Sequence, residues 1–598
     1  MTSTYILAGD STHQHYDADG FDAAADDNIY VGQGALVFGF AQTSGTLCNG
    51  INLAGTVTMT VDGTVAGSYR GISDEGHDST SSQITIGRTG LVETTAPLDS
   101  GDAIYMVGNI MRLSNAGSVS GEMYVGGNNN VVVNGGYLDG LRQIGVQFVG
   151  NGDSVTNTGT ILGGSNTSGN LYGAIDYGHD NDASDPADDV LENDGTIGGL
   201  LGVTYCSAAV GGTMNITNHG SISATAGPAI SARAGQNGGG GAVTSAETLS
   251  LTNTGVISMS GIGSAIVAQG DFIDTIDNSG TISATGGDAI VENGTGALEV
   301  TNTGHIVGDI SFGSDGGTYD GTLGSIDGAI LSSGGNNTML GGAEADIFQL
   351  STGAGGINIL HGNGGDDLFS FDFGEGLTKN CVVDGGDGND TMSFLVGGSI
   401  TAKLLAHVTS IETVTFESPN SIVLTDAFVA SAANHTVTVN GSGLSDTINA
   451  SKVTTVTNHV IFDAGGGADT MYASGGADTF VYDAVSDSTG KVFDIIHNLN
   501  FAKDHIALPD TAAITGIDAA ITTGRLDKAT FNSDLATATG GGHLGAAHAV
   551  LFAPTTGSYA HDTFLVVDLN GTAGYQSGLD LVIQLTGATG TLAPFDFT

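Results

Sequence analysis

The sequence predicts an all-β chain in which a right-handed parallel β-helix, a solenoid, is followed by a parallel β-roll and a β-rich C-terminal region. Two repeating patterns and the composition lead to this fold class. The phrase apolar-x-Asn-x-Gly-x-Ile recurs between residues 46 and 330, and a glycine–aspartate phrase recurs between residues 332 and 482. With 40% hydrophobic residues the chain can fold despite a net charge of −51, and its 598 residues include 99 glycines.

Residues 1–45 are acidic and rich in small side chains. Five aspartates crowd around two histidines in this stretch, namely Asp17, Asp19, Asp22, Asp26 and Asp27 around His13 and His15. We expect a solvated arm or a segment that orders on assembly, with metal binding as the alternative.

The Asn-x-Gly phrase predicts the β-helix over residues 46–330. Its asparagines are separated by 19 to 36 residues, at positions Asn115, Asn134, Asn157, Asn193, Asn218, Asn253, Asn278 and Asn302. Such a step fits one coil of a parallel β-helix, with Asn and Gly in the turn. Stacked coils then align the Asn side chains in a hydrogen-bonded ladder. An antiparallel β-sandwich, the alternative, requires hairpin turns and no common phrase.

Two of these coils are long and carry insertions, which we expect to leave the solenoid as loops. One insertion, 176–189, is rich in Asp, and the other, 235–241, is rich in Gly. The repeated phrase resembles repeats in secreted bacterial adhesins and in polysaccharide-active β-helix proteins.

The glycine–aspartate phrase defines a second region, residues 331–510, with an inserted segment around 395–440. Its clearest copy, 385–392, reads G-G-D-G-N-D-T-M and matches G-G-x-G-x-D-x-U, where U is a large apolar residue. Further copies cover 341–348 and 362–369, and a tandem pair is centred on residues nine apart, Asp469 and Asp478. Degenerate copies place Asn337, Asn358 and Asp446 at the acidic position.

The chemistry of this phrase points to calcium. Glycine allows turns with positive φ that expose main-chain carbonyls, and Ca²⁺ takes six to eight oxygen ligands from such carbonyls and from carboxylates. We therefore expect several calcium ions. The candidate ligands are Asn337, Gly341, Asp346, Asn358, Gly362, Gly364, Asp366, Asp367, Gly385, Gly386, Asp387, Gly388, Asn389, Asp390, Asp446, Gly465, Gly467, Asp469, Gly475 and Asp478.

These nonapeptides are the signature of the calcium-binding β-roll of RTX (repeats-in-toxin) proteins, which the chain resembles. The segments 475–508 and 562–585 resemble the end of that roll in proteins exported by type I secretion, and 592–598 resembles an uncleaved export signal. The phrase Ile411-Glu412-Thr413-Val414 is similar to one in surface-layer proteins of alphaproteobacteria. The resemblance implies export from a Gram-negative cell, with residues 511–598 as C-terminal cap and secretion signal. External calcium would then fold the roll.

Composition excludes several classes of partner. Twelve Lys and Arg face 63 Asp and Glu, which argues against binding to nucleic acid or to anionic membrane surfaces. No long apolar stretch predicts a membrane span, and the first residues lack the features of a signal peptide. Three scattered cysteines, Cys48, Cys206 and Cys381, predict no disulfide framework.

No catalytic motif of the related secreted enzymes is present. The chain contains neither H-E-x-x-H nor G-x-S-x-G, so we expect no enzyme. Two stretches, 74–78 and 176–180, share D-x-G-H-D. Solvated surface loops are the preferred interpretation of both. The alternatives are acid–base chemistry by Asp74, Asp78, Asp176 or Asp180, or an extra calcium site at Asp180, Asp182 and Asp185.

The sequence therefore predicts a calcium-dependent, self-assembling extracellular protein, a surface-layer lattice or filament subunit. Its expected partners are calcium, copies of itself and, as a further possibility, a cell-surface polysaccharide. The alternatives are an adhesin or carbohydrate-binding protein that does not polymerise and, third, a polysaccharide lyase or hydrolase.

Overall fold

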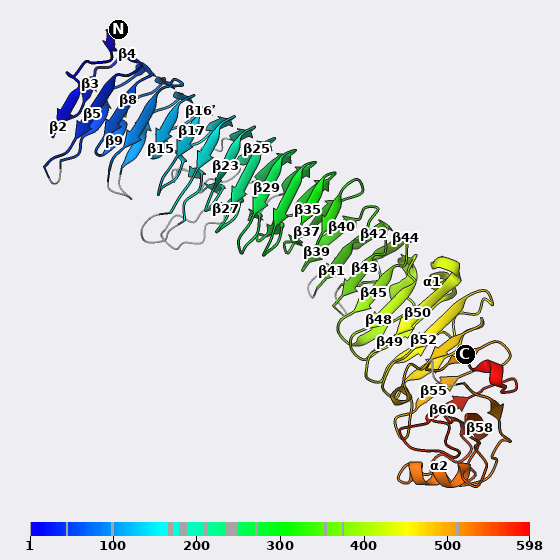
Figure 1. The fold of residues 1–598 in the computed structure, drawn as a ribbon. Helices are drawn as coiled ribbons and strands as arrows, with labels where there is room; N and C mark the ends of the chain where they lie inside the picture. Colours follow the sequence, from blue (N-terminus) through cyan, green and yellow to red (C-terminus); the bar gives the residue numbers. More distant parts are fainter. Residues whose placement is uncertain are drawn as a thin grey trace. The chain divides into compact units, whose positions relative to one another are not determined.

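A computed structural model describes the chain as two compact units, Met1–Ser333 and Gly334–Thr598. The described residues are 2–43, 46–96, 101–165, 171–178, 188–207, 212–234, 248–269, 273–351, 356–372, 376–509 and 513–598. Nearly all regular structure consists of short parallel strands stacked coil upon coil, as Figure 1 shows. The predicted all-β parallel solenoid is confirmed.

In unit 1 each coil contributes one strand to each of three sheets. Sheet A runs from β1 (Ser3–Ile6) to β37 (Gly316–Asp320), sheet B from β2 (Gln14–Tyr16) to β38 (Ser325–Asp327), and sheet C from β3 (Phe21–Ala23) to β39 (Ala329–Ser332). Equivalent residues of successive coils lie in register, so identical apolar side chains stack inside. Ile197, Ile222 and Ile257 form such a buried column.

The predicted asparagine ladder runs along unit 1 from Asn115 to Asn302. Each side-chain Nδ2 donates to Oδ1 of the asparagine one coil further on, at 2.7–2.8 Å. All eight asparagines are buried. Because an unpaired buried amide is costly, the ladder fixes the register of neighbouring coils.

The N-terminal residues are not an arm, and this prediction is wrong. They form the first strands of the solenoid: β1 pairs with β4 (Asp27–Val31), β2 with β5 (Leu36–Phe40) and β3 with β6 (Asn49–Leu53). Asp17, Asp22 and Asp26 are exposed, but two of the five aspartates bind main-chain N–H groups of the next coil. Asp17 accepts from the Thr43 N–H at 2.7 Å and Asp19 from the Asn49 N–H at 2.6 Å.

Within unit 2, described by itself, the strands form three stacks, called here sheets D, E and F. Sheet D contains β41 (Ile347–Leu350), β43 (Leu368–Phe371), β45 (Thr391–Phe394), β48 (Thr413–Phe416), β50 (Thr436–Asn440), β52 (His459–Asp463), β54 (Thr479–Val481) and β56 (His505–Ala507). Sheet E contains β46 (Gly398–Ile400), β49 (Asn420–Val423), β51 (Thr447–Asn449), β53 (Thr470–Tyr472), β55 (Asp494–His497), β60 (Leu581–Thr586), β59 (Thr563–Val567), β58 (His548–Phe552) and β57 (Gly516–Ile517). Sheet F contains β40 (Asn336–Leu340), β42 (Asn358–Gly364), β44 (Val382–Asp387) and β47 (Val408–Thr409).

The segment around 395–440 is not an insertion, contrary to its assignment from the sequence. Its strand β48 pairs with β45 on one side and with β50 on the other, so it continues the stack. Buried Val414 and Phe416 extend the apolar interior through this coil. The segment also contains two 3₁₀ turns, η1 (Leu404–His407) and η2 (Ala433–His435), and the helix α1 (Asp426–Ser431).

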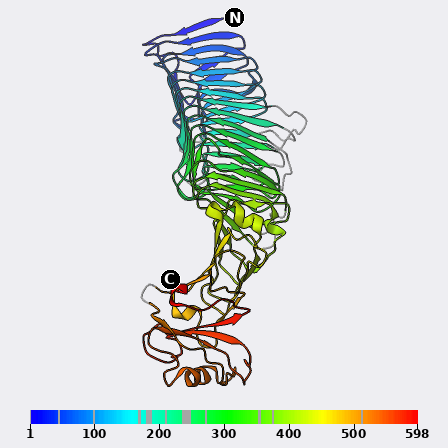
Figure 2. The same cartoon turned by 90° about the vertical axis from the view of Figure 1, so that its right-hand side faces the viewer.

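The last hundred residues close one end of sheet E. Strand β60 pairs in parallel with β55 and antiparallel with β59, which pairs antiparallel with β58. Helix α2 (Phe531–Thr539) packs beneath these strands around buried Phe531, Phe552 and Phe564 (Figure 2). Among the described residues, no helix has the length and apolar character needed to cross a membrane. Cys48 and Cys381 are buried free thiols.

Candidate metal site in the roll

A ladder of carboxylates runs along part of sheet D, where Asp346, Asp367, Asp390 and Glu412 directly precede β41, β43, β45 and β48. The main-chain N–H of Asp346 donates to Oδ1 of Asp367 at 2.8 Å, and that of Asp367 to Oδ1 of Asp390 at 2.9 Å. Asp390 donates in turn to Oε2 of Glu412 at 2.8 Å. Each carboxylate therefore ties its own coil to the coil before it.

A second ladder lies along sheet E. The N–H of Asn420 donates to Oδ1 of Asp446 at 2.6 Å, that of Asp446 to Asp469 at 2.7 Å, and that of Asp469 to Asp494 at 2.9 Å. Asp478, nine residues after Asp469, precedes a strand of sheet D instead. Consecutive nonapeptides thus face opposite sides of unit 2, as in a roll whose turns alternate.

Glycines of the repeat leave the space that the ladder carboxylates occupy. A Cβ on Gly362 would lie 1.8 Å from Oδ2 of Asp367, and one on Gly385 would lie 2.3 Å from Oδ2 of Asp390. Gly386 and Gly388 of the same turn have φ of 104° and 154°, which other residues rarely adopt. The first glycine of the copies at 341–348, 362–369 and 385–392 therefore leaves room for the buried carboxylate five residues later.

These carboxylates are buried close to one another, and this raises their pKa values. Burial, with the neighbouring carboxylates of Asp390 and Asp346, raises the pKa of Asp367 to about 7. Burial, with Glu412 and Asp366, raises the pKa of Asp390 to about 6. The second oxygens of Asp367 and Asp390 are buried and accept no hydrogen bond from the described residues. The ladder thus holds excess negative charge in poorly solvated positions.

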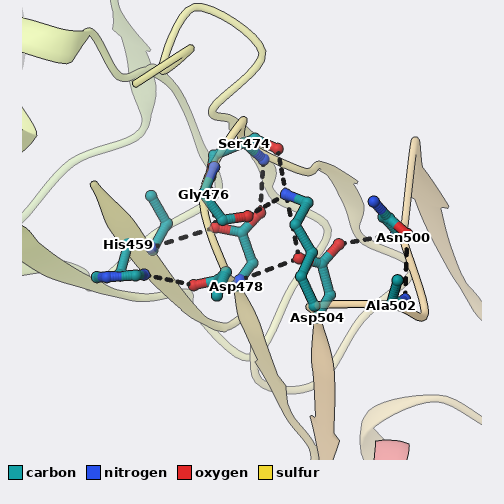
Figure 3. Close-up of polar contacts among 10 residues, drawn as sticks. His459, Ser474, Gly476, Asp478, Asn500, Ala502 and Asp504 are labelled. Atoms are coloured by element: carbon teal, nitrogen blue, oxygen red, sulfur yellow. Dashed lines mark hydrogen bonds and ion pairs between the residues drawn. The ribbon is translucent and has the colours of Figure 1, made fainter. Parts of the chain in front are cut away.

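The final pair of the sheet D stack shows how a cation fits this arrangement (Figure 3). The Asp478 N–H donates to Oδ1 of Asp504 at 3.1 Å, as in the other pairs. Here the ammonium of Lys503 lies 3.1 Å from the Ser474 carbonyl oxygen, contacts the Gly476 carbonyl oxygen, and lies 3.4 Å from Oδ1 of Asp504. Two turn carbonyls and a carboxylate of the next coil therefore surround one positive charge.

Side chains alone do not form a metal site. Across the parts of the chain that the structure describes, no three His, Cys, Asp or Glu side chains are placed to hold a metal ion. Main-chain carbonyls must supply most ligands of any cation between the coils. The contacts of Lys503 show that the turn of Ser474 and Gly476 presents carbonyls in this way, and the carboxylate oxygens of Asp367 and Asp390 that accept no hydrogen bond are suitable ligands, so these residues fit calcium.

Apart from the glycines, which would act through their carbonyls, the structure divides the predicted ligands into three groups. The first, Asp346, Asp367, Asp390, Asp446, Asp469 and Asp478, is buried in the ladders. The second, Asp366, Asp387 and Asn389, is exposed on the turns beside them. Asn337 and Asn358 do not occupy the acidic position, because they pair with each other within β40 and β42 at 2.7 Å.

Sequence reasoning missed three ladder residues, Glu412, Asp494 and Asp504. Each stands two residues before a buried apolar side chain, as every ladder aspartate does, but without the preceding glycines. The spacing acidic-x-apolar was therefore the available signal.

The two D-x-G-H-D stretches belong to different environments. Asp74 is buried and accepts the N–H groups of Val107 and Gly76, whereas Asp78 accepts the N–H of Thr80 at 2.9 Å. Burial raises the pKa of Asp176. Asp180, Asp182 and Asp185 lie outside the described residues.

No protein-family model matches the chain, and no curated protein is significantly similar to it.

Proposed function

We propose that this chain is a calcium-dependent extracellular structural protein whose subunits assemble on the surface of a Gram-negative bacterium. The observation that carries the proposal is the pair of carboxylate ladders in unit 2. Buried carboxylates one coil apart repel each other, and a divalent cation between coils removes that repulsion.

Calcium, when bound, supplies the positive charge that the ladders lack. The residues of the chain orient the carboxylates, leave space for them and form the apolar interior behind them. The carboxylates of Asp367 and Asp390 are oriented by N–H groups of the preceding coil, and that of Asp346 by the N–H of Gly342 in its own turn. The glycines leave room for those carboxylates, and buried Phe348, Phe369 and Met392 behind them form the apolar interior.

Support for self-assembly comes from the first coils of unit 1. Several large apolar side chains are exposed there, including Tyr5, Leu7, Tyr16, Phe40 and Leu47. Tyr16 and Phe40 also line an apolar pocket of about 330 Å³. Clustered exposed apolar residues are typical of protein contact surfaces. With a net charge of −51, subunits repel one another until cations screen them.

The cellular location in this proposal rests on the resemblance of the C-terminal region to type I secretion substrates. Calcium-dependent folding agrees with that route, because the roll remains unfolded in a calcium-poor cytoplasm and folds on exit.

Electron microscopy of purified protein, in chelator and then in millimolar calcium, tests the proposal. Ordered sheets or filaments that form only with calcium are the expected result. Replacement of Tyr16 and Phe40 by Ser should abolish assembly and leave calcium binding intact. Folded monomers at every protein and calcium concentration would contradict self-assembly.

A second candidate function, carbohydrate binding, is favoured by a polar cluster on sheet C. Arg70 of β9 (Arg70–Asp78) donates to Asp102 at 2.9 Å, and its guanidinium lies 3.6 Å from the ring centre of Tyr105. Tyr105 of β12 (Asp102–Val107) stacks on Tyr124 of β15 (Glu122–Gly126) at 4.7 Å. Glu122, the register partner of Asp102, is 6% exposed. Phenol and carboxyl groups match the hydroxyls of a neutral sugar.

Affinity electrophoresis against neutral glucans, with alginate as the anionic comparison, tests this candidate. Tyr124→Phe should weaken retention by a neutral glucan about fivefold, the effect of one lost hydrogen bond. Tyr137→Phe on sheet B, whose hydroxyl contacts Asp139, is the control. Equal retention of both variants and the parent would exclude the cluster as the binding site.

A further inference from the structure

The turn pair that contains Asp478 and Asp504 differs from the others because it carries its own positive charge. Three oxygens surround the Lys503 ammonium: the carbonyls of Ser474 and Gly476 and the carboxylate of Asp504. The lysine side chain is only 28% exposed. It also lowers the pKa of both Asp478 and Asp504, which burial raises.

The two sequence positions that supply these carbonyls have equivalents in the other turns. Ser474 and Gly476 stand four and two residues before Asp478, so the equivalents for Asp367 are Asn363 and Gly365. The carboxylate of the following coil is also present in these turns, for example Asp390.

Only the last ladder residue is preceded by a basic side chain. The residues before the other stacked acidic groups are Ala345 before Asp346, Asp366 before Asp367, Asn389 before Asp390, Ile411 before Glu412, Ser445 before Asp446, Ala468 before Asp469, Ala477 before Asp478 and Phe493 before Asp494. A lysine is thus placed at one coil junction and absent from the equivalent position elsewhere in the ladders.

We infer that Lys503 is a tethered cation that takes the place of a calcium ion between the turns of Asp478 and Asp504. This junction therefore closes without metal, and the ion-dependent part of the roll begins at the preceding coils. The Lys503 ammonium and a calcium ion cannot occupy this place together. An ammonium in contact with both carbonyls leaves no space for Ca²⁺, whose oxygen ligands lie at about 2.3–2.6 Å.

The consequence is that the roll folds from its C-terminal junction, between the turns of Asp478 and Asp504, toward the preceding coils. A folded C-terminal junction that needs no ion orders the neighbouring strand β54, and each further coil then adds one calcium-linked step. This inference rests on the proposed calcium binding, which the experiment below measures separately.

Calcium stoichiometry of the full-length chain tests the inference. The ions bound per chain are counted by equilibrium dialysis with metal analysis, for the parent and for Lys503→Met, whose side chain has similar length but no charge. Lys503→Met should bind one calcium ion more than the parent. In chelator it should melt at a lower temperature, because the two carboxylates lose the ammonium of Lys503, and millimolar calcium should restore its melting temperature.

Two further variants locate the added ion. Lys452→Met removes an exposed lysine of the same unit and should change neither the number of bound calcium ions nor the melting temperature in chelator. Lys503→Met combined with Asp504→Asn should return the count to the parental value. An unchanged count in Lys503→Met overturns the inference while the parental count stands, whereas a parent that binds no calcium overturns the proposed function itself.

Discussion

Proton binding to the ladder gives a quantitative test of its buried charge. In the folded chain the pKa of Asp367 is about 7 and that of Asp390 about 6, whereas an unfolded aspartate ionises near pH 4. Between these values the folded state binds more protons than the unfolded state. The free energy of unfolding of the calcium-free protein must therefore fall as the pH rises. The stabilisation that comes from protonated Asp367 and Asp390 is present at low pH and lost by pH 8.

The size of the effect follows from the two pKa values. Between pH 5 and pH 8, Asp367 loses about 2.5 kcal/mol of stabilisation and Asp390 about 1.4 kcal/mol, together about 4 kcal/mol. Both side chains are at least 98% buried, so solvent screens little of this difference. Calcium competes with protons for the same oxygens, and its stabilising effect must be largest at pH 8.

Urea unfolding in chelator, followed by circular dichroism at pH 5 and pH 8, measures the effect. In the double variant Asp367→Asn/Asp390→Asn the loss between the two pH values should be about 4 kcal/mol smaller than in the parent. Asp387→Asn alters an exposed carboxylate of the same turn and serves as the control. If the double variant and the parent lose equal stability, the ladder carboxylates do not carry the buried charge assigned to them.

Two further substitutions test the packing of the coils. Asn218→Ala removes a buried amide that bonds both neighbouring coils and should lower the free energy of unfolding by about 2 kcal/mol, whereas Asn215→Ala, on the outer face, should change it by less than about 0.5 kcal/mol. Gly362→Ala forces a Cβ against Asp367 and should reduce both thermal stability and calcium binding. Gly443→Ala has open space around its added methyl group and should change neither, so equal effects of the two glycine variants would contradict the steric argument.

Much of the fold was predictable because a solenoid repeats its sequence with its structure. The Asn-x-Gly phrase located the strands of sheets A and B, and the predicted asparagine ladder exists from Asn115 to Asn302. The N-terminal coils escaped prediction because they lack the phrase. Their acidic residues looked solvated, although Asp17 and Asp19 bind main-chain N–H groups of the next coil.

The ladder was only partly predictable because it depends on stacking and not on the motif alone. Glycine spacing identified Asp367 and Asp390, but Glu412 joins the same ladder from a coil without the motif. Asn337 matched the motif and yet lies in another sheet, paired with Asn358. Lys503 could be recognised only when the structure brought it to the carbonyls of a turn 27 and 29 residues earlier.

Hydrogen exchange of individual amides, with chelator and then with calcium at neutral pH, tests the central claim most directly. The N–H groups of Asp346, Asp367 and Asp446 all donate to a carboxylate of the next coil, whereas amides of unit 1 such as that of Thr158 bond to carbonyls. The account predicts fast exchange of the three ladder amides in chelator, strong protection in calcium, and constant protection of Thr158. Equal protection of the ladder amides with and without calcium would contradict it.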